Sequence, residues 1–154
     1  MTLRDELNAN MKQAMRDRAA ERLSTLRLIL AAIKDRDIAA RGEGEDASGV
    51  DEAEILAILA KMVKQRQESA RTYEEGGRLD LAEREMNEIT VIEEFLPKQL
   101  SDDEVAAAVE AAVAEVGAES IRDMGKVMGA LKAKFTGQMD FGKVGPKVKD
   151  QLSK

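Results

Sequence analysis

The chain lacks cysteine, histidine and tryptophan, and this absence excludes several classes of functional site. Without a thiol or an imidazole, the chain contains no cysteine nucleophile, disulfide, thiolate metal site or Ser-His-Asp triad. It also contains no Glu-x-x-His pair of the kind that binds two metals in many four-helix proteins. Any catalysis would therefore depend on carboxylates, Lys or Tyr alone. We identify no catalytic residue, expect no metal or cofactor, and favour a chain that is not an enzyme on its own.

Aromatic residues are also scarce, since the 154 residues include three Phe and one Tyr. The hydrophobic content of 44% must therefore build cores from aliphatic side chains and from eight flexible Met residues. Base stacking on an aromatic platform, which is common in single-strand binding, is disfavoured by the same scarcity.

No apolar run approaches the ~20 residues that a membrane-spanning helix needs. Charged residues begin at Arg4, so the N-terminal residues do not resemble a signal peptide. This pattern favours a cytoplasmic protein without membrane contact.

The net charge of −6 is distributed unevenly along the chain. Residues 1–41 have nine Lys or Arg against six Asp or Glu, a net +3, and residues 42–100 have seven against fifteen, a net −8. Residues 101–121 have six acidic residues and no basic one, whereas residues 122–154 have eight basic against three acidic, a net +5. We call residues 122–154 the basic lobe, because such a local field matters more to association than the total charge.

Residues 1–96 carry apolar residues three and four positions apart, which is the spacing of amphipathic helices. Thr2 and Asp5 are candidate caps of a first helix that extends to Arg18. Asp17 is a candidate cap of the second helix.

Two further helices are predicted before Pro97. Ser48, three residues before Asp51, is a candidate start of a third helix that ends at Gly76–Gly77. The segment from Gly42 to Gly49 before it is a loop of glycine and acidic residues with nothing to bury. Pro97 ends a fourth helix, whose inward-facing residues are expected to be Leu79, Ala82, Met86, Ile89, Ile92 and Phe95.

Residues 97–100 are a candidate linker, and three short helices are predicted over residues 101–154. Ser101 and Glu104 form a capping box for the first of these helices. Pro146 falls in the last one, and since proline is strained in a helix interior, we expect the helix to restart there. No segment alternates like a strand, so the predicted fold class is all-α: a helical N-terminal domain of about four helices over residues 1–96, followed by a small three-helix C-terminal module.

Gly125 and Gly129 lie four residues apart, on one side of the second short helix. Glycine inside a helix costs ~1 kcal/mol relative to alanine, so the pair requires an explanation. One explanation is close packing against a neighbouring helix. The other is an exposed backbone that a phosphate or a partner can approach, with Lys132 on the same side.

The basic lobe supplies the candidate RNA-binding residues. Its side chains would contact phosphates rather than base edges, so binding would be sensitive to salt and weak in sequence preference. At about 100° per residue, Lys126, Lys132 and Lys134 point in different directions and form no single stripe. A solvated helical surface is the alternative interpretation. The full candidate set is Arg122, Gly125, Lys126, Lys132, Lys134, Lys143, Lys147 and Lys149.

Another group of charges indicates an exposed face rather than a pair of carboxylates for acid–base chemistry, which requires a concave pocket. This group comprises Glu83, Arg84, Glu85, Glu88, Glu93 and Glu94. Ser24, Thr25 and Tyr73 have no histidine base and are interpreted as packing or surface residues.

Five stretches of the chain form a recognisable combination. They are Met11-Lys12-Gln13-Ala14-Met15; Arg22-Leu23-Ser24-Thr25-Leu26-Arg27; Lys64-Gln65-Arg66 with Gly77-Arg78-Leu79-Asp80-Leu81-Ala82; Phe95-Leu96-Pro97-Lys98-Gln99-Leu100; and Asp123-Met124-Gly125-Lys126-Val127-Met128 with Gly137 and Asp140. In this combination the chain resembles the YqeY family, which is similar to the tail domain of the B subunit of the glutamine-dependent Asp/Glu-tRNA amidotransferase.

The resemblance implies a helical N-terminal domain followed by a module whose amidotransferase counterpart helps to hold tRNA. Ammonia generation and amide formation belong there to other domains and subunits. A carbon–nitrogen ligase activity with glutamine as amido-N-donor is therefore implied by resemblance only. Carried over residue by residue, the tRNA-contact role reaches Gly125, Lys126 and Lys132.

We therefore expect a non-catalytic accessory protein that binds tRNA or another RNA through the basic lobe. A protein–protein interaction adaptor, whose acidic middle docks a basic protein partner, is the alternative. A third hypothesis is an enzyme that contributes to amide transfer from glutamine. It would need a nucleophile and an activating base, and the sequence offers no convincing pair.

Overall fold

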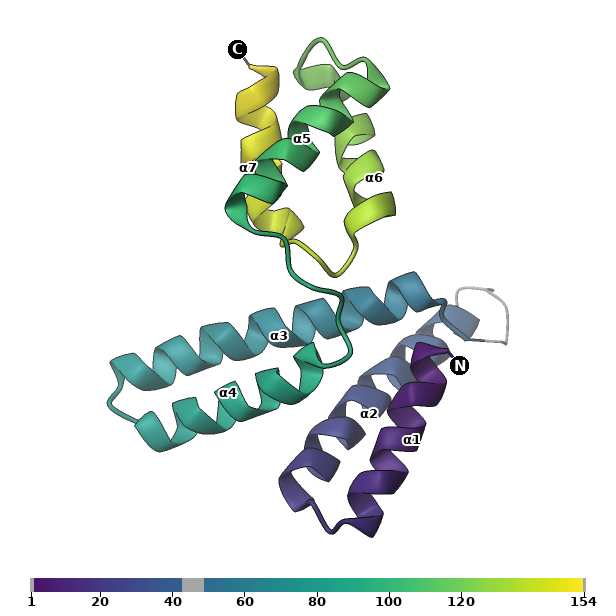
Figure 1. Ribbon diagram of the computed structural model, residues 1–154, viewed down its shortest axis with the longest axis vertical. Coiled ribbons are helices and arrows are strands. Elements are labelled where there is room, and N and C mark those ends of the chain that lie inside the picture. The colour runs from purple at the N-terminus through teal and green to yellow at the C-terminus, as the bar shows by residue number, and fades with distance from the viewer. Residues whose placement is uncertain (1, 43–48, 154) are drawn as a thin grey trace. The chain divides into compact units, whose positions relative to one another are not determined.

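The structure is a computed structural model that describes residues 2–42 and 49–153 (Figure 1). All regular elements in these residues are helices, which confirms the all-α prediction. The helices are α1 (Leu3–Arg16), α2 (Ala20–Gly42), α3 (Glu52–Glu75), α4 (Leu79–Glu93), α5 (Asp102–Val116), the 3₁₀ turn η1 (Ile121–Asp123), α6 (Met124–Phe135) and α7 (Phe141–Leu152). None of the described helices is long and apolar enough to cross a membrane.

The chain divides into two compact units, Met1–Leu96 and Pro97–Lys154. Unit 1 consists of two antiparallel hairpins, α1–α2 and α3–α4 (Figure 1). Their facing sides share one aliphatic core, whose largest fully buried side chains are Leu7, Leu26, Ile29, Ile33, Leu59 and Ile92. Each such side chain contributes about 1.5–3 kcal/mol relative to an exposed position, so these contacts dominate the stability of the unit.

Helix α4 buries only one of its two apolar rows. Ala82, Ile89 and Ile92 are buried, whereas Leu79 and Met86 are 68% and 48% exposed, contrary to the prediction that both face inward. Leu79 and Met86 are seven residues apart and so form a row of their own, three residues ahead of Ala82 and Ile89. Only the second row meets the core, and periodicity alone does not distinguish the two.

A hydrogen-bonded Schellman motif ends α1 and turns the chain toward α2. The amide of Ala19 donates to the carbonyl of Ala14 at 3.0 Å. The amide of Arg18 donates to the carbonyl of Met15 at 3.3 Å. Asp17 is therefore the C-cap of α1, which corrects the prediction that it caps α2. Thr2 and Asp5 do form the predicted capping box at the other end of α1.

The same motif ends α3 and α5, where glycine holds the left-handed position. Gly77 has φ +74° and Gly117 has φ +65°. The corresponding residue of α1 is Arg18, with φ +55°, and it is the one described non-glycine residue with positive φ. This conformation destabilises an L-residue by about 1–2 kcal/mol, because its Cβ crowds the carbonyl oxygen. The turn after α1 is thus formed by a residue type that does not favour it.

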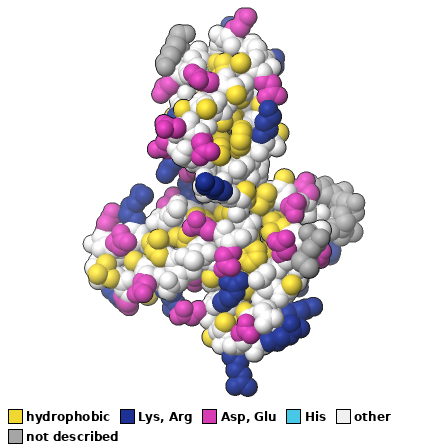
Figure 2. Space-filling view, in the orientation of Figure 1, with side chains coloured by type: hydrophobic (Ala, Val, Ile, Leu, Met, Phe, Trp, Pro, Cys, Tyr) yellow, Lys and Arg dark blue, Asp and Glu magenta, His cyan; other side chains and the backbone are white. Residues whose placement is uncertain are grey.

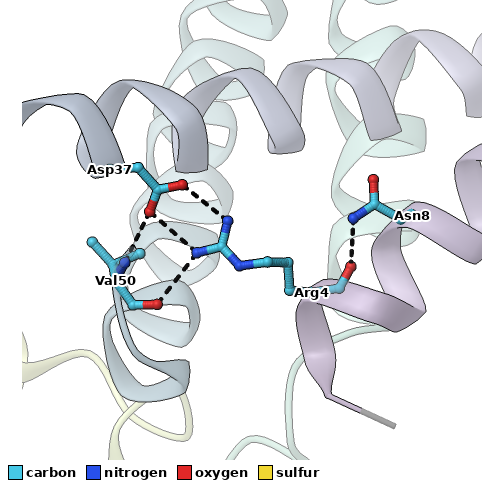
Figure 3. A network of polar contacts seen from close by, with 4 residues as sticks. All are labelled: Arg4, Asn8, Asp37 and Val50. Carbon is cyan, nitrogen blue, oxygen red and sulfur yellow. Dashed lines mark hydrogen bonds and ion pairs between the residues drawn. The ribbon is translucent and has the colours of Figure 1, made fainter. Parts of the chain in front are cut away.

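A polar network connects α1, α2 and the segment before α3. The guanidinium of Arg4 donates to both carboxylate oxygens of Asp37, at 2.9 and 3.1 Å, and to the carbonyl of Val50 at 3.3 Å (Figure 3). The amide of Val50 also donates to Asp37 at 2.8 Å. These hydrogen bonds, with that from Arg4 the largest cause, hold the pKa of Asp37 below its ordinary value.

Gly49, the last residue of the expected loop of glycine and acidic residues, lies against this network, whereas residues 43–48 of that loop lie outside the described residues. A Cβ at Gly49 would approach the Asp37 carboxylate oxygen to 2.8 Å, and its φ is +94°. Val50 beside it is buried. Helix α3 is capped by Asp51, whose side chain accepts from the amide of Glu54. The alternative start at Ser48 lies outside the described residues.

Unit 2 packs α5, α6 and α7 around a small aliphatic core that includes Val109, Val127, Leu131, Val144 and Val148. Ser101 and Glu104 form the predicted capping box of α5. The expected linker, residues 97–100, hydrogen-bonds to the turn between α6 and α7. The Leu100 amide donates to the Gln138 carbonyl at 2.9 Å, and the Gln99 side chain donates to the Gly137 carbonyl.

Helix α7 continues through Pro146, contrary to the expected restart at that residue. Proline removes one backbone hydrogen bond, in this case the bond to the carbonyl of Gly142. Gly142 is exposed to solvent, so water can satisfy this carbonyl. Val144 and Val148, on either side of the proline, are both buried, and their packing stabilises a continuous helix across Pro146.

We predict that Arg18→Gly stabilises the protein, because glycine adopts the left-handed conformation without a Cβ clash. The expected rise in the free energy of unfolding is about 0.5–1 kcal/mol, since relief of strain exceeds the added entropy of the unfolded chain. Urea denaturation measures it. Arg18→Ala is the control, because it removes the charge but keeps the Cβ. Equal stability of the two variants would contradict the strain argument.

We also predict that the Asp37 network stabilises the protein only above acidic pH. Because the folded pKa of Asp37 is lowered, its contribution is fully present above the ordinary value of about 3.8 and is lost as pH falls through the folded pKa. Asp37→Asn should lower the free energy of unfolding at pH 7 by about 1–3 kcal/mol. Urea denaturation across a pH series should show this deficit shrinking in acid.

The matched control for Asp37 is Asp35→Asn, which changes an exposed aspartate on the same helix. This variant should unfold like the wild type at every pH. A deficit in Asp37→Asn that stays constant from neutral to strongly acidic pH would refute the role assigned to its charge.

Candidate nucleic-acid interface

All of the candidate RNA-binding residues are exposed, and they lie on three consecutive elements of unit 2. Arg122 lies in η1. Four residues lie on α6, namely Gly125, Lys126, Lys132 and Lys134, and three on α7, namely Lys143, Lys147 and Lys149. Because α6 and α7 pack against each other in one core, these positions belong to one folded unit.

The turn that leads into α6 is stabilised by its own side chains. The Ser120 hydroxyl accepts from the amide of Arg122, and the Asp123 carboxylate accepts from the amides of Glu119 at 2.9 Å and Ser120 at 3.4 Å. These backbone hydrogen bonds lower the pKa of Asp123. The carboxylate therefore serves the local fold and fixes where α6, with its lysines, begins.

The two glycines of α6 are open to solvent. A Cβ built on Gly125 or Gly129 would meet no neighbouring group within 4 Å. Val127 and Leu131 point to the opposite side, into the core. Close packing of a neighbouring helix within the described unit is therefore wrong as an explanation of the pair. What remains is an accessible strip of backbone with Lys126 and Lys132 at its edges.

The lysines of α6 face different neighbours. The Lys134 ammonium lies 2.7 Å from the carboxylate of Glu115 on α5. The Lys132 ammonium lies 6.0 Å from the centre of the Phe141 ring, at the start of α7. An exposed ion pair such as Lys134–Glu115 is worth only ~0.2–1 kcal/mol, so a phosphate can compete for the lysine. The prediction that these residues form no single stripe agrees with this arrangement.

The basic surface does not extend around the whole of unit 2. Helix α5 carries Asp102, Asp103, Glu104, Glu110 and Glu115 at exposed positions. In Figure 2, magenta acidic groups are scattered among white and yellow groups in the upper part of the view, where α5 lies. The candidate basic residues of unit 2 lie on the sides formed by η1, α6 and α7.

A groove in unit 1 brings together residues that sequence reasoning treated separately. The groove between α2 and α4 has a volume of about 960 Å³ and is lined by Ser24, Thr25, Glu83, Arg84, Asn87 and Glu88, among others. Its existence depends on how the two hairpins diverge, and no local sequence signal predicts that.

The groove shows no catalytic arrangement. The Thr25 hydroxyl donates to the carbonyl of Glu21, and the Glu88 carboxylate pairs with Arg66 at 2.8 Å. Among the residues that the structure describes, no group of three acidic side chains is arranged to hold a metal ion. The polar side chains that line the groove thus form hydrogen bonds or ion pairs within the fold, or face solvent.

We predict that Gly129→Ala stabilises unit 2, because open space lies where the methyl group would point. The expected gain in the free energy of unfolding is about 0.5–1 kcal/mol, which is the difference in helix preference between the two residues. Chemical denaturation measures it. Gly117→Ala is the matched control and should destabilise, since Gly117 has positive φ. A loss of stability in Gly129→Ala would restore the packing explanation.

Comparison with known proteins finds relatives among fungi. Over 105 residues, the chain is 34% identical to Altered inheritance of mitochondria protein 41, mitochondrial, of Clavispora lusitaniae; the match covers 67% of this chain and 58% of the relative. It is 37% identical over 90 residues to the protein of that name in Meyerozyma guilliermondii, covering 58% and 44% respectively. An uncharacterized protein of Schizosaccharomyces pombe is 29% identical over 100 residues, covering 65% and 73%. The chain thus spans about half the length of the first two relatives.

These relatives correct the expectation of a cytoplasmic protein. The absence of a recognisable signal favoured the cytoplasm, but the Clavispora and Meyerozyma relatives are both named as mitochondrial proteins. Composition is a weak guide to location because targeting depends on segments separate from the folded core.

One family matches nearly the whole chain. The family described as Yqey-like protein matches residues 4–152, a span that includes both compact units. This match confirms the resemblance carried by the five sequence stretches. The chain belongs to the YqeY-like family.

Proposed function

We propose that the protein is a non-catalytic accessory module that binds RNA, tRNA in the first instance, through η1, α6 and α7. The observation that carries the proposal is the open strip of backbone at Gly125 and Gly129, bordered by Lys126 and Lys132. Two glycines without a packing role weaken a helix. Access for a partner provides a reason to keep them.

The expected contacts are electrostatic. Gly129 lies in the middle of α6, where backbone amides already bond within the helix, so this part of the strip offers close approach rather than free hydrogen-bond donors. Gly125 is the second residue of α6 and lies in its first turn. Lysines on both sides then attract phosphates of the sugar–phosphate backbone. Contacts of this kind position a nucleic acid without reading its sequence.

Binding without catalysis also agrees with the side chains available. Amide transfer from glutamine requires a nucleophile and an activating base within hydrogen-bond distance. The chain has neither Cys nor His. We therefore assign any such chemistry to other proteins with which the module would act.

A protein adaptor is the second candidate, and the groove between α2 and α4 favours it. Glu21, Asp80, Glu83 and Glu88 line this groove together with Arg22 and Arg84, so its charge is net acidic. A basic protein segment would complement it. Capture of such a partner that survives charge reversal in unit 2 would favour the adaptor.

We predict that reversing Lys126, Lys132 and Lys147 to Glu abolishes most RNA binding. Fluorescence anisotropy with unmodified tRNA across a NaCl series is the measurement. Wild-type affinity should fall steeply with salt, and loss of three phosphate contacts should reduce the log–log slope by about 2–3. The matched control reverses Lys34, Lys61 and Arg71, which are exposed on α2 and α3 of unit 1.

A substitution without charge change tests the glycine strip itself. Gly129→Leu should weaken tRNA binding while leaving the salt slope near that of the wild type, because it blocks approach and removes no cation. Wild-type affinity in both the triple reversal and Gly129→Leu would refute the proposed interface. Failure of the wild type to bind at low salt would refute RNA binding by the protein alone.

A further inference from the structure

The outer face of α1 carries a second group of cations, in unit 1. Lys12 and Arg16 are one helical turn apart and line the same shallow depression, of about 280 Å³. Arg18 follows in the turn between α1 and α2, and all three residues are exposed. We call these three residues the hairpin tip. Figure 2 shows dark blue side chains gathered at the lower end of the view, where this turn lies.

The cations of the hairpin tip make no ion pair among the described residues, although Asp17 lies between Arg16 and Arg18 in the chain and Asp5 lines the same depression. Arg16 donates to the side-chain oxygen of Gln13 at 3.4 Å, which leaves its charge uncompensated. Asp17 accepts from the same glutamine at 2.9 Å rather than from a cation. Across residues 2–42 and 49–153, no ion pair involves Lys12, Arg16 or Arg18. Asp5, at the far end of the depression, caps α1 through Thr2.

The ordinary explanation of such a cluster is the helix dipole, because cations are favoured near a helix C-terminus. That explanation covers Arg16, which lies in the last turn of α1. It does not require an arginine at Arg18, where the backbone is left-handed and the chain uses glycine at the two equivalent positions, Gly77 and Gly117. A strained residue kept where glycine folds better is an observation from which function can be inferred.

Arginine at this position has a chemical consequence. Arg18 is exposed at the end of the hairpin, and its guanidinium presents a planar set of donors that matches phosphate oxygens. With Lys12 and Arg16 on the adjoining face of α1, the tip offers three cations to a phosphate backbone.

We infer that Lys12, Arg16 and Arg18 form a second phosphate-contacting surface for the same RNA that binds unit 2. The inference rests on the proposed function and extends it, because it assigns RNA contacts to both units. Contacts from two units on one chain strengthen binding through effective concentration as well as through added charge.

The test uses the full chain, unmodified tRNA as the probe, and anisotropy across a NaCl series. The tip variant combines Lys12→Ala, Arg16→Ala and Arg18→Gly, which removes three charges and leaves the turn with its preferred residue. We expect a log–log salt slope smaller by about 2–3 and an affinity at low salt weaker by roughly tenfold or more. Lys34→Ala, Lys61→Ala and Arg71→Ala together remove the same charge from exposed sites of unit 1 and should bind like the wild type.

Arg18→Gly alone separates binding from folding. It should unfold no more readily than the wild type, and its salt slope should fall by about 0.7–0.9, the value for one phosphate. An unchanged slope in this variant would overturn the role of Arg18, and an unchanged slope in the tip variant would overturn the whole inference.

The outcomes separate this inference from the proposed function. Normal binding by the tip variant, with loss in the unit 2 triple reversal, overturns the inference and leaves the proposed interface standing. Loss in the tip variant, with normal binding by the triple reversal, contradicts the interface in unit 2 and also overturns the inference, because the tip is inferred to contact the RNA that unit 2 binds. No binding by the wild type overturns both, and equal weakening by the control variant overturns any specific role for the tip.

Discussion

Aliphatic packing between neighbouring helices is the interaction on which both units depend. The sequence contains no cysteine for a disulfide, and few aromatic side chains are available to fill a core. Leu26, Ile29 and Leu59 in unit 1, and Val127 and Val148 in unit 2, are therefore buried almost completely. Because each unit is small, it buries only a modest apolar area. The backbone amides and carbonyls at the ends of its helices must therefore be hydrogen-bonded.

Polar groups act mainly at those ends. Capping boxes begin α1 and α5, and Schellman motifs end α1, α3 and α5. The Arg4–Asp37 pair extends this principle over a longer distance, since it connects two helices and the backbone at Val50. These polar groups stabilise the helix ends and the contacts between helices.

The uneven surface charge bears on the RNA binding proposed for a protein that is acidic overall. The net charge of −6 comes chiefly from residues 42–121, whereas the outer face of α1 and the sides of α6 and α7 are basic. At physiological salt the screening length is about 8 Å, so a phosphate close to these faces interacts mainly with the local cations. The open backbone of α6 and the strained Arg18 are both unfavourable for folding alone. Contact of these surfaces with a binding partner would explain the presence of both features.

The sequence by itself determined the features that depend on neighbours within one or two helical turns. Helical spacing, the caps at Thr2 and Ser101, the glycine-ended helix at Gly76–Gly77 and the family resemblance could all be recognised there, because capping and helix hydrogen bonds join residues close in the chain. Where one local signal competes with another, sequence reasoning was less secure. Asp17 can cap either of two helices, and Pro146 can begin a helix or be carried within one.

Only the tertiary structure decided which surfaces are covered. Leu79 and Ile89 have similar hydrophobicity and helical spacing, yet only Ile89 meets the core. The partner of Asp37, the open space beside Gly129 and the groove between α2 and α4 likewise depend on helices distant in sequence. The physical reason is that burial is a property of two packed surfaces, and one amphipathic helix specifies only its own.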